Sequence, residues 1–174
     1  YSGDRSAIVD AYPHVKKYLS LYTFDDNGLV NDRSSSGTWD WTDWGKNIDE
    51  RIIDNCWFYM ALKAARKMAV LTDNDNDTVD YDAKMQKIES NFNNVFWQGS
   101  YYQSPDFSGD PDDRANGLAV IAGLADETKW PQIREVLQSY RYASPYMEKY
   151  VLEAQFIMGY ENDALERIKR EDRY

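Results

Sequence analysis

The chain has 174 residues, a formal net charge of −10 and a pI near 4.6. This length fits one domain over residues 1–174, and 43% hydrophobic residues suffice for a packed core, which excludes a disordered acidic tail. The excess of carboxylates excludes a nucleic-acid-binding protein, which needs a basic stripe, and argues against binding to an anionic membrane surface. Apolar runs of only a few residues exclude a membrane-spanning helix.

Single copies of cysteine and histidine limit the chemistry further. Cys56 alone cannot form an intramolecular disulfide or a cysteine-built zinc site, and His14 alone argues against a Ser-His-Asp triad. We therefore expect no metal and no cofactor. The chain opens on Tyr1 rather than Met, so we expect a piece of a longer protein. The sequence leaves the compartment open, with a secreted or periplasmic parent as one option.

The first predicted elements are a helical entry over residues 1–22 and an aromatic loop over residues 23–46. Apolar residues recur at helical spacing from 4 to 22, and Pro13 predicts a kink or a division into two short helices. The aromatic loop holds three of the six Trp residues.

A long amphipathic helix follows the aromatic loop. Asn47 can cap it, with Glu50 in the capping-box position. Its apolar row consists of Ile52, Cys56, Met60, Ala64 and Met68. The next helix is predicted to begin at Asp77 or Thr78.

The remaining chain reads as further helical hairpins. Asp110 opens a segment with a cap, a proline and first-turn acids, which is typical of a helix start, and Ser144 followed by proline opens a later helix. Other helices are predicted over 131–140 and 162–172, with a short β-hairpin near 101–102. Short links favour antiparallel neighbours. The sequence therefore predicts an all-α fold of about seven helices, with residues 47–174 as helical hairpins.

The aromatic loop carries the strongest functional signal. Trp39, Asp40, Trp41, Asp43 and Trp44 lie within six residues of one another. Trp faces bind the apolar faces of sugar rings, and Asp accepts sugar hydroxyls, so this cluster indicates a carbohydrate site. The alternative is that the Trp residues anchor the loop to the core while the Asp residues satisfy backbone donors.

Two helix starts supply further candidates for ligand contact. Arg114 beside Asp113 forms a charged fork that can hold a sugar hydroxyl, and Tyr146 and Glu148 can point into a pocket from the start of their helix. The alternatives are an acid that answers the helix dipole and an exposed helix face.

The acidic run over residues 73–77 raises the possibility of a calcium site. An EF-hand loop starting there needs Gly at its sixth position and Glu at its twelfth. Thr78 and Lys84 occupy these positions, so the run is interpreted as a solvated loop before a helix.

Three stretches, in this order, resemble the α-L-rhamnosidase family of glycoside hydrolases. The first joins the Asp-Trp-Gly of residues 43–45 to the apolar helix of residues 52–62, the second spans residues 113–124, and the third spans residues 143–154. No single motif is diagnostic, and the ordered set carries the resemblance over about residues 28–174.

The resemblance implies part of an α/α toroid of six helical hairpins, in an enzyme that removes terminal α-L-rhamnose by inversion with a general acid and a general base. In that family the acid lies upstream of the Asp-Trp loop and the base after the last charged helix, in motifs that this chain lacks. The resemblance therefore implies no catalytic residue here. It carries sugar contacts over to Asp43 and Trp44, with Trp39, Asp40 and Trp41 as neighbours.

An incomplete toroid leaves the inner faces of its helices open. We therefore expect the isolated chain to be inactive and to self-associate through these apolar faces. Two other readings stay open. One is a different six-hairpin glycosidase, such as a glucuronidase- or trehalase-like enzyme, and the other is a non-catalytic helical binding module.

Overall fold

A computed structural model describes residues 4–31 and 42–169. These ranges hold seven α-helices and two isolated β-bridges but no named strand, which confirms the all-α prediction. None of the helices in the described ranges is long and apolar enough to cross a bilayer. The helices are α1 (Ser6–Leu19), α2 (Glu50–Leu71), α3 (Thr78–Phe96), α4 (Asp113–Ala122), α5 (Trp130–Ser139), α6 (Pro145–Ile157) and α7 (Glu161–Lys169).

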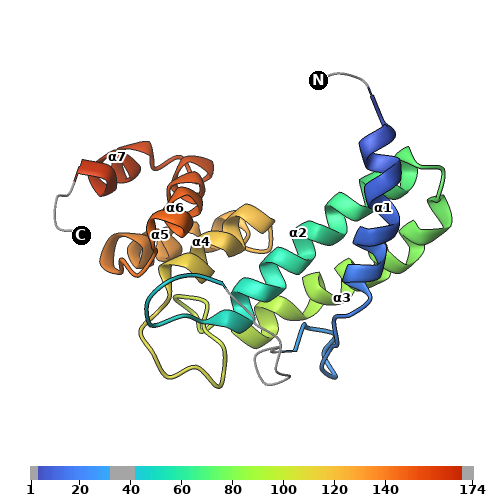
Figure 1. The fold of residues 1–174 in the computed structure, drawn as a ribbon. Coiled ribbons are helices and arrows are strands. Elements are labelled where there is room, and N and C mark those ends of the chain that lie inside the picture. The colour runs from blue at the N-terminus through green and yellow to red at the C-terminus, as the bar shows by residue number, and fades with distance from the viewer. Residues whose placement is uncertain (1–3, 32–41, 170–174) are drawn as a thin grey trace.

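Three consecutive hairpins form the body of the molecule: α2 with α3, α4 with α5, and α6 with α7. The first helices of these hairpins pack in a row, with α4 between α2 and α6, and α1 packs on the other side of α2 (Figure 1). This order is that of a partial six-hairpin toroid. It brings the starts of α2, α4 and α6 to one edge.

The core lies between these helices. Ile52, Cys56 and Leu62 of α2 are fully buried, as are Leu118 and Ala119 of α4. The small residues of α4 permit a close approach to α6: a Cβ on Gly117 would lie 3.5 Å from the Val151 Cα. The small residues of α4 therefore accommodate a neighbouring helix, α6.

Two helix starts differ from the prediction. Asn47 does not cap α2, because its backbone is left-handed (φ 58°) and its side chain exchanges two hydrogen bonds with the Asp110 backbone, at 2.9 and 3.0 Å. Since the Asp110 backbone is engaged there, α4 begins at Asp113, and Asp112 caps it by accepting the Arg114 N–H at 3.0 Å.

The remaining local predictions are confirmed in part. Ser144 caps α6 as expected, accepting the Tyr146 N–H at 3.2 Å. Pro13 lies inside α1 without dividing it, so of the two predicted alternatives, a kink or a division, the division into two short helices is wrong. The hairpin expected near Tyr102 is reduced to a single bridge between Trp97 and Tyr102.

Candidate functional site

The candidate site is the edge where α2, α4 and α6 begin. Asp43, in the loop before α2, is buried there and accepts the Ser144 N–H at 3.0 Å, the Ser144 hydroxyl, and Arg114 Nη1 at 3.1 Å. Its carboxylate therefore ties the aromatic loop to the starts of both α4 and α6. The structure brings together Asp43 and Arg114, two residues that the sequence proposed separately.

Arg114 is fully buried and forms the centre of this arrangement. Its three guanidinium nitrogens donate to five oxygens: Asp112 Oδ1 (2.7 Å), Asp43 Oδ2 (3.1 Å), and the carbonyls of Trp44 (3.5 Å), Lys46 (3.0 Å) and Asn47 (2.6 Å). Burial lowers the pKa of Arg114, but the charge of Asp112 and the hydrogen bonds to its carboxylates outweigh this and raise it. We call Arg114, Asp43 and Asp112 the loop cluster.

Asp112 was not among the predicted site residues, although it links the start of α4, the Arg114 side chain and the start of α2. Besides capping α4 and binding Arg114, its Oδ2 accepts the Asp49 N–H at 2.9 Å at the start of α2. Burial raises its pKa to about 6, against the opposing effect of Arg114. The sequence predicted Asp110 as the cap of this helix, so neither the capping role of Asp112 nor its tie to α2 was predicted.

Asp113 and Glu148 belong to a second buried group, centred on Arg167 of α7. Glu148 accepts Arg167 Nε and Nη2 at 2.9 Å each, in a bidentate pair, and Asp113 accepts Nη2 as well. Arg167 also donates to the carbonyls of Leu137 (2.6 Å) and Tyr140 (3.0 Å). We call Arg167, Asp113 and Glu148 the helix cluster. Sequence reasoning missed Arg167, which reads as one more charge on a polar helix.

Two aromatic side chains face solvent at this edge. Trp44 is 66% exposed and Tyr146 is 48% exposed. Tyr146 lies 6.0 Å from Tyr150, which stands edge-on to Trp57 at 5.0 Å. Burial and the neighbouring Tyr150 raise the pKa of Tyr146, with a smaller effect from the charge of Asp43. The predicted contacts Trp39, Asp40 and Trp41 lie outside the described residues.

This arrangement offers aromatic surface rather than paired reactive acids. The four predicted or newly found carboxylates at the edge each bind a buried arginine: Asp43, Asp112, Asp113 and Glu148. Over residues 4–31 and 42–169, no three His, Cys, Asp or Glu side chains gather as metal ligands. Chemically, the site can present ring faces to a ligand from a rigid loop.

Comparison with protein families gives a match over most of the chain. Residues 1–142 match the model of the bacterial alpha-L-rhamnosidase six-hairpin glycosidase domain. No curated protein sequence matches the chain.

Solved structures give the same fold at low sequence identity. The rhamnosidase of Bacillus sp. GL1 is 23% identical with a TM-score of 0.77, over 97% of this chain and 19% of that one. The α-L-rhamnosidase of Dictyoglumus thermophilum is 19% identical with a TM-score of 0.79, over 99% and 20%. The Klebsiella oxytoca rhamnosidase, solved with rhamnose bound, is 19% identical with a TM-score of 0.79, over 95% and 33%. The chain thus spans a fifth to a third of the length of these proteins.

Proposed function

Because the chain belongs to the bacterial α-L-rhamnosidase six-hairpin glycosidase domain family, we propose that it is part of the catalytic domain of an inverting enzyme that hydrolyses terminal α-L-rhamnose from glycans or glycosides. The neighbour from Klebsiella oxytoca holds rhamnose, which supports a carbohydrate ligand for this domain. Residues 1–174 act as one helical unit within it.

The exposed Trp44 on a clamped loop carries the proposal. A ring that contacts sugar must be exposed yet held still, and the loop cluster fixes the backbone of Trp44 through its carbonyl and through the adjacent Asp43. We assign sugar contact to Trp44 and Tyr146, and to Trp39, Asp40 and Trp41 of the same loop. Asp43 acts as a positioning residue.

The other predicted site residues also position the sugar-contact residues and do not themselves contact the sugar. Arg114 holds the loop, while Asp113 and Glu148 hold Arg167 and thereby the start of α6, where Tyr146 lies. With these carboxylates engaged, the general acid and general base come from outside this chain, and the isolated chain has no rhamnosidase activity.

The sugar contact is tested by titrating L-rhamnose into the chain and following saturation-transfer NMR signals. Trp44→Ala is expected to abolish the signal, because it removes the ring face. Phe156→Ala is the matched control, since Phe156 is an aromatic residue of α6 that is 55% exposed. Equal signals from the two variants would contradict the site. Release of p-nitrophenol from an aryl rhamnoside by the isolated chain would contradict the assignment of the acid and base elsewhere.

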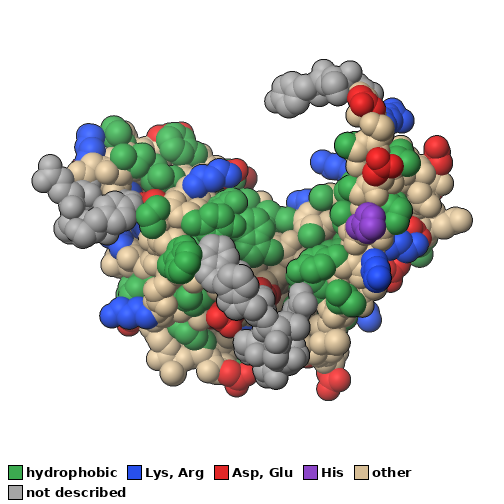
Figure 2. Space-filling view, in the orientation of Figure 1, with side chains coloured by type: hydrophobic (Ala, Val, Ile, Leu, Met, Phe, Trp, Pro, Cys, Tyr) green, Lys and Arg blue, Asp and Glu red, His purple; other side chains and the backbone are tan. Residues whose placement is uncertain are grey.

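Self-association is proposed through an apolar groove between α1 and α2. A cavity of about 520 Å³ lies there, and Figure 2 shows hydrophobic side chains gathered in the hollow beside α1. Such a surface favours coverage by a second copy. The lining includes Val15, Tyr18, Leu19, Tyr22, Trp57 and Phe58.

Light scattering over a concentration series tests this proposal. Tyr18→Glu places a charge in the groove and is expected to give a monomer. Val79→Glu, on a side chain of α3 that is 72% exposed, should leave the association unchanged. If the unsubstituted chain is strictly monomeric at high concentration, the proposal is overturned.

A further inference from the structure

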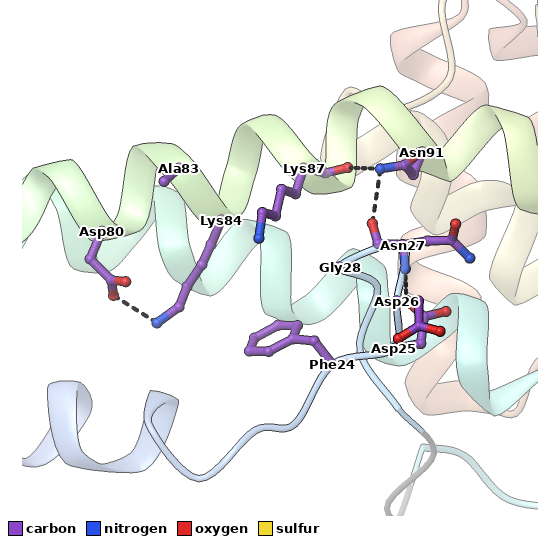
Figure 3. Close-up of a pocket in the computed structure, with 10 residues that line it drawn as sticks. All are labelled: Phe24, Asp25, Asp26, Asn27, Gly28, Asp80, Ala83, Lys84, Lys87 and Asn91. Atoms are coloured by element: carbon purple, nitrogen blue, oxygen red, sulfur yellow. Dashed lines mark hydrogen bonds and ion pairs between the residues drawn. The ribbon is translucent and has the colours of Figure 1, made fainter.

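A second cavity lies apart from both arginine clusters, between α3 and the loop that follows α1. It has a volume of about 350 Å³, within the range of small-ligand pockets. Figure 3 shows Phe24 on the loop side and Lys84 and Lys87 extending toward it from α3. None of its lining residues belongs to the site described above.

The loop wall of this cavity is held in place before any ligand arrives. Asp25 Oδ1 accepts the N–H groups of Asn27 and Leu29 at 2.9 Å each, and its Oδ2 pairs with Arg51 at 2.7 Å. Asn91 of α3 donates to the Asn27 carbonyl at 2.8 Å, which joins the loop to the helix. A preformed pocket loses little entropy on binding.

Gly28 lets the loop lie directly on a lysine of α3. Its φ is +73°, and a Cβ there would stand 2.9 Å from Lys87 Cδ. The aliphatic stem of Lys87 is therefore packed under the loop, and its ammonium group is carried at the cavity.

Two charged side chains of the lining form no ion pair within residues 4–31 and 42–169: the cation of Lys87 and the carboxylate of Asp26. Lys84 pairs with Asp80 at 2.6 Å, whereas Lys87 forms no ion pair within the described ranges. Phe24 offers a half-buried ring, fixed edge-on to Phe58 at 5.4 Å between centroids. Asp26 lines the same cavity and supplies a hydrogen-bond acceptor.

We propose that this cavity binds a hexuronate unit of an acidic glycan. A sugar acid matches the three features together: its carboxylate pairs with Lys87, its ring lies on Phe24, and its hydroxyls donate to Asp26. A simple anion would not need the aromatic wall, and a neutral sugar would leave the cation unmatched.

An adjoining cavity supports a ligand longer than one sugar. Its volume is about 230 Å³, and it shares Asp80 and Lys84 with the first cavity. It continues along α3 toward Asp77, past Lys16 of α1. The two cavities together provide adjacent positions for neighbouring sugar units.

Calorimetric titration of the chain at low salt tests the proposal. D-glucuronate is expected to bind more tightly than acetate or methyl β-D-glucopyranoside, because acetate lacks the ring and the hydroxyls and the glucoside lacks the carboxylate. Lys87→Gln, which keeps part of the stem under Gly28, should weaken glucuronate binding about tenfold, the effect of losing one charged hydrogen bond. Lys67→Gln removes an exposed lysine from α2 and should leave binding unchanged.

Three results would overturn the proposal. Acetate binding as tightly as glucuronate would make this a simple anion site. Tighter binding of a Glu-Glu peptide would indicate an acidic protein partner. Equal effects of the two lysine substitutions would remove Lys87 from the site. Trp44→Ala should leave glucuronate binding intact, so failure here is distinguishable from failure of the rhamnose site.

Discussion

The loop cluster and the helix cluster are built alike but serve different parts of the molecule. Each has a buried arginine whose guanidinium donates to five oxygens, and each includes two carboxylates. Arg114 binds three carbonyls of the loop that carries Trp44. Arg167 binds two carbonyls around the end of α5 and fastens α7 to α4 and α6. One therefore shapes a candidate ligand surface, and the other joins helices.

The two clusters meet at consecutive residues. Asp112 turns to Arg114 and Asp113 turns to Arg167, so the start of α4 is shared between them. Because both acids are buried with their partners, neither cluster can loosen without leaving a charge unpaired at the same helix terminus. Both clusters stabilise the fold, but only the loop cluster binds the loop that carries Trp44.

Removing either arginine charge should have the largest effect. Arg114→Leu and Arg167→Leu are each expected to lower the free energy of unfolding by about 3–5 kcal/mol, because buried carboxylates lose their partner. Arg66→Leu, which breaks an exposed pair with Asp82, should cost about 0–1 kcal/mol. Urea unfolding measures all three.

Trp44 fluorescence then distinguishes the two clusters. Its contribution is the difference between each variant and the same variant with Trp44→Phe. It should change with Arg114→Leu and stay constant with Arg167→Leu. A change with both would mean that the clusters are not separable.

Replacing each arginine by lysine should have a smaller effect of about 2 kcal/mol. Lysine keeps the charge but offers three donors in place of five, so buried oxygens lose partners. Urea unfolding of Arg114→Lys and Arg167→Lys should give similar losses of stability, while Arg114→Lys should weaken rhamnose binding more than Arg167→Lys. Unchanged stability in both would show that the fork geometry is unimportant.

The pH dependence should come from the loop cluster through Asp112. Its folded pKa of about 6 exceeds the unfolded value of about 3.9, so the folded state holds more protons between them. Its contribution therefore makes stability fall as pH rises from about 4 to 6, by at most about 1.4 kcal/mol per pH unit. Carboxyl-carbon NMR titration measures the midpoint directly.

Asp126 provides the opposite sign as an internal control. Hydrogen bonds from Lys129 and Thr128 lower its pKa to about 2, so its contribution increases as pH rises from about 2 to 4. An Asp112 midpoint at or below the ordinary value of about 3.9 would contradict the role of burial in the loop cluster.

The smallest predicted loss follows removal of one hydroxyl. Ser144→Ala deletes the cap of α6 and the hydroxyl donor to Asp43, and should cost about 1 kcal/mol. Ser20→Ala removes an exposed hydroxyl bond to the Lys17 carbonyl and should be nearly neutral. Urea unfolding measures the loss of stability, and rhamnose titration tests whether Ser144 also supports the loop through Asp43. Equal losses of stability in Ser144→Ala and Ser20→Ala would contradict a contribution of Ser144 to the cap of α6 and to the loop.

Helix existence and several helix starts were predictable because their causes are local. Ser144 followed by proline predicted α6, and the helical spacing of apolar residues predicted α2. Of the predicted apolar row, Ile52 and Cys56 are buried but Ala64 is exposed, because the buried face of α2 continues instead through Leu62, Ala65 and Ala69. Asn47 failed as a cap because a partner 63 residues away, Asp110, holds its side chain. Local patterns do not contain such a competitor.

The candidate site divides in the same way. The sequence placed Trp44 in a loop ahead of a helix but left open whether its ring faces a ligand or anchors the loop to the core, and only the structure shows that Trp44 is exposed. Asp43 and its partner Arg114 lie 71 residues apart in the sequence, and Asp113 and its partner Arg167 lie 54 residues apart. Residue type alone does not reveal which acid meets which arginine, so fork-like ligand binding and internal pairing were indistinguishable in the sequence.

The burial of Cys56 makes its reaction with a thiol reagent a measure of local unfolding around α2. It is the sole cysteine, lies fully inside α2 and has a pKa raised by burial, so a thiol reagent reacts only after the helices around it separate. The rate of thiol labelling therefore records how often the packing of α2 against its neighbours opens under native conditions, without any introduced cysteine.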